Sequence, residues 1–276
     1  MFQKVAVFGL CLMGSAQALG APAPRAEKPP AHANLDLEAT KKALESGDEA
    51  RALGALDEIE LSAERKAVPL VDALLNRGAS TKLLLRALGV AGALGQEPSS
   101  AAIAPYTKHR SAEVRRAAAQ SLARTKGPLA IQALRLALRS SDAALRGAAA
   151  TGLGALGAKD AVADLFSVLP RETPEAAGAI GTLCNGDDCA KFVTLLGKLP
   201  FETMQSGFLP ILLRTDGEVP DALKLKLIEQ LRRLATAKAN ELLTTARSSF
   251  PASGSPKVKA AIDAALRGRS AVGEEP

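Results

Sequence analysis

Residues 111–122 read Ser111-Ala-Glu-Val-Arg-Arg-Ala-Ala-Ala-Gln-Ser-Leu122, and the same pattern returns 31 positions later as Asp142-Ala-Ala-Leu-Arg-Gly-Ala-Ala-Ala-Thr-Gly-Leu153. The residues that follow each stretch repeat as well, first after 31 and then after 30 positions. Three apolar positions recur in each copy: Ile131, Leu134 and Leu138; Val162, Leu165 and Leu169; Phe192, Leu195 and Leu199. So many matches in one register indicate an internal repeat. A period of about 30 residues is typical of proteins that stack small structural units.

Each repeat unit is predicted to hold two helices, because its apolar residues recur every three or four positions. The joints between the predicted helices are rich in Gly and Pro: residues 95–98, 126–128, 157–160 and 170–174, and Gly186. Asp142 and Thr173 stand where a helix cap is expected, and Pro174 suits the first position of a helix. A helix pair cannot bury its apolar faces alone, so we expect successive pairs to stack on one another.

The composition agrees with closely packed helices. The chain has 276 residues, of which 47% are hydrophobic and only 3% aromatic. This apolar content excludes a chain that is disordered throughout. Most of the apolar residues are Ala, Leu and Val, a composition that suits helices better than sheets. The 35 basic residues barely exceed the 29 acidic residues and are spread along the chain, whereas a nucleic-acid binder concentrates them on one surface.

Residues 142–154 follow the pattern Asp-x-x-Leu-Arg-x-Ala-Ala-x-x-x-Leu-Gly. This pattern resembles the HEAT repeat, in particular its short form named after the phycocyanobilin (PBS) lyases. The copy at 111–123 keeps Val114, Arg115, Ala117 and Ala118 but has Ser111 in place of the Asp. The copy at 173–184 has Ala177 in place of the Arg.

The resemblance implies both a fold and a structural role for three residues. The fold is all-α, a right-handed α-α superhelix (a HEAT-like solenoid) of about five or six helix pairs. In HEAT proteins the Asp and Arg of the pattern form a ladder that ties successive units together. Arg115, Asp142 and Arg146 are therefore expected to be structural, and the ladder is expected to weaken at Ala177. The repeat implies an architecture and not the lyase activity, because one fold hosts many functions.

The N-terminus is typical of a secretory signal peptide. Lys4 precedes an uncharged apolar run at residues 5–13, and small residues follow at 15–18 in an A-x-A cleavage pattern. We expect cleavage after Ala18, with cleavage after Gly20 as the alternative. The mature protein is then predicted to be exported and periplasmic, with no membrane span, because no second apolar stretch is long enough to cross a bilayer.

The predicted domain organisation has four segments. The body is a HEAT-like solenoid, and the Pro-rich stretch before it is expected to be extended because proline restricts the backbone. The segments are a signal peptide at 1–18, a disordered linker at 19–34, the solenoid at 35–268 and a disordered tail at 269–276.

The resemblance also suggests a binding surface. In HEAT-like stacks the second helix of each unit usually lines the concave face, so its residues outside the core stripe are candidate contacts. Moving from unit to unit, these positions pass from basic to apolar, which suits an extended or helical peptide. The alternative is that the apolar members belong to the core between helices and the arginines to a solvated face. The candidate contacts are Arg135, Arg139, Phe166, Val193 and Leu196.

Cys184 and Cys189 both follow the predicted signal peptide. An exported protein meets an oxidising environment, so a structural disulfide is the favoured interpretation. A metal site that uses the two aspartates between the cysteines, a redox-active pair and free thiols are the alternatives. The C-x4-C spacing is weak for zinc, and redox centres favour C-x-x-C.

The sequence contains no catalytic signature. G-x-S-x-G, H-E-x-x-H and P-loop motifs are absent, and His32 and His109 have no partner at ligand spacing. We therefore expect a non-catalytic, exported scaffold or adaptor that binds a protein or peptide and needs no cofactor, metal or nucleic acid. One alternative is a lyase-like or tetrapyrrole-handling HEAT protein. The other is a redox or metal-responsive module that uses Cys184 and Cys189.

Overall fold

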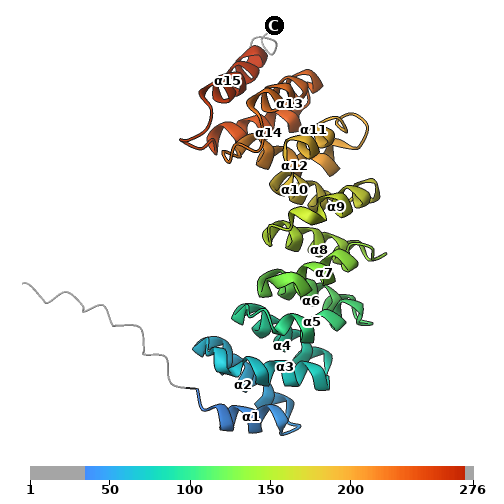
Figure 1. The fold of residues 1–276 in the computed structure, drawn as a ribbon, viewed down its shortest axis with the longest axis vertical. Coiled ribbons are helices and arrows are strands. Elements are labelled where there is room, and N and C mark those ends of the chain that lie inside the picture. Colours follow the sequence, from blue (N-terminus) through green and yellow to red (C-terminus); the bar gives the residue numbers. More distant parts are fainter. Residues whose placement is uncertain (1–34, 271–276) are drawn as a thin grey trace, which may run out of the picture. The chain divides into compact units, whose positions relative to one another are not determined.

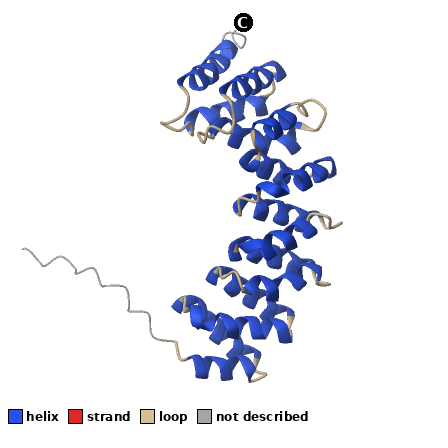
Figure 2. Cartoon of the chain, in the orientation of Figure 1, coloured by secondary structure: helices blue, strands red, loops and turns tan. Residues whose placement is uncertain are grey.

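The computed structural model describes residues 35–270, which form helices joined by loops (Figures 1 and 2). Within this range there are 15 α-helices and no β-strand, which confirms the predicted all-α fold. The helices are α1 Leu37–Glu45, α2 Glu49–Ser62, α3 Val68–Arg77, α4 Thr81–Leu94, α5 Ser99–Ile103, α6 Ala112–Thr125, α7 Gly127–Ala137, α8 Ala143–Ala155, α9 Val162–Val168, α10 Pro174–Leu183, α11 Gly186–Val193, α12 Phe201–Leu213, α13 Asp221–Leu234, α14 Ala237–Ser248 and α15 Pro256–Ser270.

Some of the sequence predictions concern residues outside the described range. The signal peptide at 1–18 and the linker at 19–34 lie outside the described residues, as does the predicted tail from residue 271 onward. The last described helix, α15, ends at Ser270. Four short 3-10 segments accompany the helices: Arg65–Ala67, Ala104–Lys108, Lys159–Ala161 and Leu169–Arg171.

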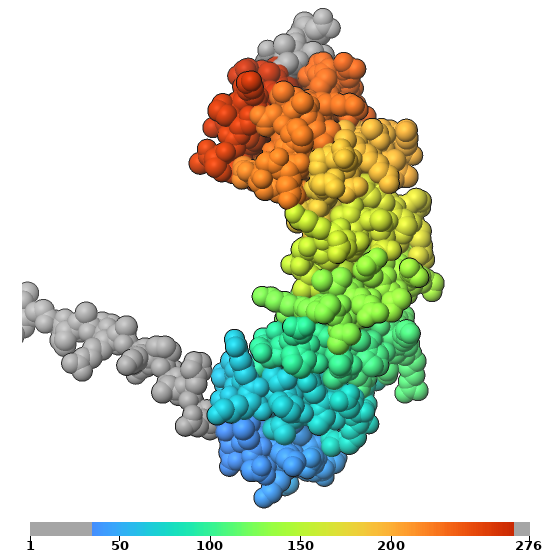
Figure 3. Space-filling view, viewed as in Figure 1, coloured from blue at the N-terminus to red at the C-terminus, as the bar shows by residue number. Residues whose placement is uncertain are grey.

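From α2 onward the helices alternate between two layers. The even-numbered helices pack on one another in one layer, and the odd-numbered helices form the second layer beside them (Figure 1). In the space-filling view each coloured segment packs on the one before it (Figure 3). Within the described residues, helices α2–α3 through α14–α15 make seven successive pairs, slightly more than the predicted five or six. The stack of helix pairs expected from the HEAT resemblance is thus confirmed.

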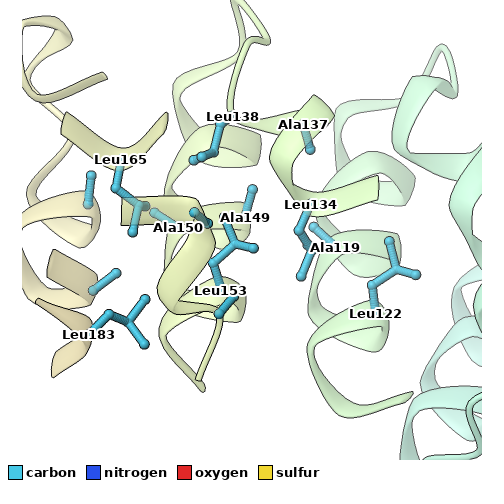
Figure 4. Close-up of a cluster of buried hydrophobic side chains, with 14 of the residues drawn as sticks. Ala119, Leu122, Leu134, Ala137, Leu138, Ala149, Ala150, Leu153, Leu165 and Leu183 are labelled. Carbon is cyan, nitrogen blue, oxygen red and sulfur yellow. The ribbon is translucent and has the colours of Figure 1, made fainter. Parts of the chain in front are cut away.

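The core lies between the layers and continues from unit to unit. Figure 4 shows leucine and alanine side chains of α6 to α10 that interdigitate there. Of the nine repeating apolar positions, Ile131, Leu195 and Leu199 are partly exposed and the other six are buried. Burying one leucine side chain contributes about 1.5–3 kcal/mol, so the repeat in the sequence is a repeat of core contacts.

From α2 to α12 the even-numbered layer is the more tightly spaced of the two. A Cβ atom added to Gly181 of α10 would lie only 2.1 Å from the carbonyl oxygen of Gly207 in α12, and one added to Gly92 of α4 would lie 3.0 Å from Ser121 Cα in α6. By contrast, α7 and α9 of the odd-numbered layer make few direct contacts. Over this range successive pairs therefore tilt toward the even-numbered layer. This is the opposite of the sequence interpretation, which placed α7, α9 and α11 on the inner side.

Arg115 and Asp142 connect α6 to α8. Arg115 Nη2 lies 2.5 Å from Asp142 Oδ2, and Arg115 Nη1 also donates to the carbonyl of His109 at 2.9 Å. The other carboxylate oxygen of Asp142 caps α8 by accepting from the backbone amides of Ala144 and Leu145. The Arg115 hydrogen bond holds the pKa of Asp142 below its ordinary value. One carboxylate therefore starts a helix and joins it to the preceding unit.

Arg146 is bound differently, because the next unit carries Thr173 where an Asp would stand. The Arg146 side chain is only 6% exposed. Its Nη1 donates to the carbonyl of Ser141 at 2.9 Å, and its Nε lies 3.4 Å from Thr173 Oγ1. Thr173 is the N-cap residue of α10, as predicted, but its side chain makes no cap hydrogen bond and instead accepts from Arg146.

The ladder of Asp and Arg side chains does not continue at Ala177. This residue is fully buried, and a Cβ on Gly207 of α12 would lie 2.4 Å from its carbonyl oxygen. Since no arginine occupies the space, α12 approaches α10 directly, backbone against backbone.

The predicted disulfide between Cys184 and Cys189 is present, with a Cα–Cα distance of 5.3 Å. It joins the end of α10 to α11, and both cysteines are fully buried. Arg214, in the α12–α13 loop, donates from Nη1 to the carbonyl of Cys184 at 2.5 Å and from Nη2 to Glu218 at 2.7 Å. Burial under this loop favours a structural role, because a redox-active pair needs access to its reaction partners.

Replacing both cysteines with serine is expected to lower the free energy of unfolding by about 2 kcal/mol, because the short loop loses its cross-link. Urea denaturation under non-reducing conditions measures this difference. In the native wild-type protein we expect no free thiol at these positions and little reduction by dithiothreitol until denaturant is added. Two free thiols in the native protein purified without reductant would contradict the structural role.

Candidate functional site

A shallow groove lies between α7 and α9, in the more widely spaced layer. Its volume is about 390 Å³. Because few contacts join these two helices directly, side chains and not backbone line the space between them. The lining residues are Pro128, Ile131, Gln132, Arg135, Leu136, Arg139, Asp160 and Asp164.

Helix α7 presents leucines on the side that faces away from the core. The buried stripe of this helix runs through Ala130, Ala133, Leu134 and Ala137. Outside the stripe, the side chains of Leu129 and Leu136 are 49% and 52% exposed. Seven residues make about two helical turns, so the two leucines share one face.

Exposed leucines of this kind are uncommon in the described part of the chain. Only four large apolar side chains are exposed among the described residues, and α7 carries two of them. The other two are Leu61 of α2 and Leu234 of α13. Single exposed leucines are normal on soluble proteins, but two on one face next to a groove are typical of an interaction site.

Charged groups are distributed unevenly along the groove. Near its middle, Arg135 Nε lies 2.6 Å from Asp164 Oδ2, so these two charges compensate each other. Arg139, at the C-terminal end of α7, is exposed and forms no ion pair with any described residue. Asp160, toward the other end, is likewise exposed and unpaired within the described part of the chain. The groove is therefore neutral at its centre and charged at its ends.

Two of the five predicted contacts, Arg135 and Arg139, line this groove, and the other three do not. Val193 is fully buried, so its predicted binding role is wrong: the side chain belongs to the core. Phe166 is half-buried, with its ring edge-on to Phe192 at 6.4 Å between centroids. Leu196 is also partly buried and packs against the core. For these three apolar positions the structure agrees with the alternative interpretation of the sequence, in which they belong to the core between helices.

The sequence interpretation missed Leu129 and Leu136. A signal was present, because both residues lie off the stripe formed by Leu134 and Leu138. On a helix with 3.6 residues per turn, Leu136 points about 200° away from Leu134. Apolar residues on opposite sides of one helix indicate either two buried faces or an exposed apolar face, and the sequence alone does not distinguish these.

A second groove, of about 430 Å³, separates α12 from α14. Its leucines, Leu209 and Leu242, are only partly exposed. At its edge Lys238 Nζ forms an ion pair with Glu202 Oε1 at 2.7 Å. This groove contains no exposed leucine, whereas Leu136 in the lining of the α7–α9 groove is exposed, and we therefore regard the latter as the candidate site.

No metal-binding cluster is evident in the described residues. No three His, Cys, Asp or Glu side chains come together there as a metal site would require. His109 Nδ1 accepts a hydrogen bond from the backbone amide of Ser111 at 3.1 Å, just before α6 begins. None of the described helices is both long and apolar enough to span a membrane. His32 lies outside the described residues.

Comparisons with known proteins find similar chains at low sequence identity. No protein-family model and no curated protein matches the sequence. One similar solved structure is the complex of CpcE and CpcF of phycocyanin lyase from Nostoc sp. PCC7120, with 20% identity, a TM-score of 0.47, and coverage of 83% of this chain and 98% of that chain. Another is an engineered protein, with 17% identity, a TM-score of 0.40, and coverage of 86% and 97%. At this level of similarity no activity is carried over, and the helix-pair architecture rests on the geometry of the chain itself.

Proposed function

We propose that this protein is an exported, non-catalytic scaffold or adaptor that binds another protein through the α7–α9 groove. The observation that supports the proposal is the pair of exposed leucines on α7, Leu129 and Leu136, beside the unpaired Arg139. An exposed apolar stripe flanked by charge is the usual composition of a protein-binding groove, because apolar area supplies affinity and charge supplies orientation.

The scaffold that holds this surface is rigid enough for binding. The buried side of α7 packs into the continuous core, and Arg135 is paired with Asp164 of α9. The exposed side chains are therefore presented in place before a partner arrives, which lowers the entropy cost of association.

Leu136→Asp is expected to weaken partner binding at least about tenfold. Burying a half-exposed leucine contributes about 1–1.5 kcal/mol, and a buried aspartate adds a desolvation cost. The measurement is affinity capture of the partner from the exported fraction, followed by titration of the purified pair. Leu61→Asp is the matched control, because Leu61 is an exposed leucine (79%) on the distant helix α2.

Both variants should keep the wild-type helix content and melting temperature, since both sites are exposed. The wild type and Leu61→Asp should capture the same partner. Equal capture by Leu136→Asp would show that the groove is not the binding site.

A further inference from the structure

We infer that the occupant of the α7–α9 groove is an amphipathic α-helix of the partner protein, with acidic side chains at the end that meets Arg139. This inference rests on the proposed function and specifies the chemistry of the partner. It follows from three properties of the groove: the hydrogen-bonding groups it lacks, the spacing of its apolar side chains and the sign of the charge at one end.

The lining residues favour a helix over an extended peptide. A buried peptide backbone must exchange its hydrogen bonds to water for new partners. Beyond their first turns, the backbone groups of α7 and α9 are bonded within their own helices, and Gln132 is the one amide side chain among the lining residues. The unpaired charged groups, Arg139 and Asp160, lie only at the ends of the groove. Arg135 is held by Asp164. A helix forms its own backbone hydrogen bonds and contacts the groove only through its side chains. It therefore suits a groove that is lined by side chains.

The apolar side chains set the length and pattern of the occupant. Helix α7 has 11 residues, which corresponds to about 16 Å and three helical turns. Leu136 and the half-buried Ile131 contribute to the lining, and Leu129 continues the exposed apolar face toward the N-terminus of α7. A partner helix that covers this length presents apolar residues at positions i, i+3 or i+4, and i+7.

The charge at the C-terminal end of α7 determines the sign of the charge that the partner carries there. Arg139 is unpaired, and Arg171 reaches the same end, where its Nη2 donates to the carbonyl of Ser140 at 2.9 Å. Glu172 follows Arg171 in the chain, so this end carries two guanidinium groups and one carboxylate and has a net positive charge. A carboxylate of the partner forms bidentate, charge-assisted hydrogen bonds with a free guanidinium, whereas a lysine or arginine there is repelled.

The test uses a phage-displayed library of helical peptides of about 15 residues, long enough for three to four turns. Selection is for binding to the wild-type protein, with removal of clones that also bind Leu136→Asp. The selected peptides are then synthesised, and their Kd values are measured against the wild type, Arg139→Glu and Arg116→Glu. Arg116 is an exposed arginine on α6, in the other layer, and serves as the matched control.

We expect the selected peptides to share apolar residues three, four and seven apart and to carry Asp or Glu in one terminal turn. Arg139→Glu should weaken their binding about tenfold or more, whereas Arg116→Glu should leave it within about twofold. Changing the acidic residues of the peptide to Lys should restore binding to Arg139→Glu, which shows that the two charges meet. Circular dichroism of the complex should show added helix.

Three results would overturn the inference. Peptides that need Leu136 but lack acidic residues and bind Arg139→Glu normally would refute the acidic helix while leaving the groove as a binding site. Peptides that need Leu136 but bind without forming helix would refute the helical occupant in the same way. The absence of any Leu136-dependent peptide would remove the proposed function as well.

Discussion

Replacing Gly181 with alanine is expected to destabilise the protein by about 3 kcal/mol or more, the largest effect of any single methyl group that we predict. The added Cβ would lie 2.1 Å from Gly207 O and 2.8 Å from Gly207 C. Both are backbone atoms of the neighbouring helix, so no side-chain rotation relieves the overlap. Helices α10 and α12 would have to separate, with loss of the core contacts on either side.

The matched control is Gly178→Ala, one helical turn earlier on the same helix α10. A Cβ at Gly178 would meet its nearest neighbours at 3.7 Å, which is ordinary van der Waals contact. Alanine is a better helix former than glycine, so this variant should be neutral or more stable by up to about 1 kcal/mol.

Thermal and urea unfolding measure both variants. For a protein of this size about 3 kcal/mol corresponds to a fall in Tm of about 6–12 °C. If Gly181→Ala unfolded at the same temperature as Gly178→Ala, the close approach of α10 and α12 would be refuted.

Replacing Arg146 with alanine is expected to cost about 2–3 kcal/mol, the second largest effect. The buried guanidinium donates to the carbonyls of Ser140 and Ser141, and it also reaches the carbonyl of Arg171 and the hydroxyl of Thr173. Its removal leaves these acceptors without their charged donor and opens a cavity where the aliphatic stem packed.

Two further variants show whether the geometry of Arg146 matters. Arg146→Lys keeps the charge but loses the planar fork, so it should retain only part of the stability. Arg116→Ala removes an exposed arginine of α6 and should change the free energy of unfolding by less than about 0.5 kcal/mol. Equal effects of Arg146→Ala and Arg116→Ala in urea denaturation would contradict the structural role of Arg146.

These two predictions concern parts of the fold that the sequence indicated to different degrees. The matching positions of Arg115 and Arg146 allowed a structural role to be predicted for both, through the resemblance to HEAT repeats. The partners of Arg146 were not predictable, because three of them are backbone carbonyls, which carry no signature in the sequence. The importance of Gly181 was hidden for a similar reason: glycines are frequent in this chain, and only the position of α12 distinguishes Gly181 from Gly178.

The candidate site was also predicted in part. The periodicity of α7 placed Arg135 and Arg139 outside the core stripe, and both line the groove. The same repeat offset, carried to α11, selected Val193, which is fully buried. Equivalent positions in successive units differ in exposure, because the spacing between neighbouring helices differs from one unit to the next.

The sequence by itself determined that this protein is a stack of helix pairs, since a period of about 30 residues with helical spacing inside each unit leaves no other way to bury its leucines. The pairing of Cys184 with Cys189 also followed from the sequence. Only the tertiary structure decided which layer is tightly packed, that Val193 lies in the core and that Leu136 does not. Exposure depends on how closely the next helix approaches. That distance is set by contacts between residues far apart in the chain, such as Gly181 and Gly207.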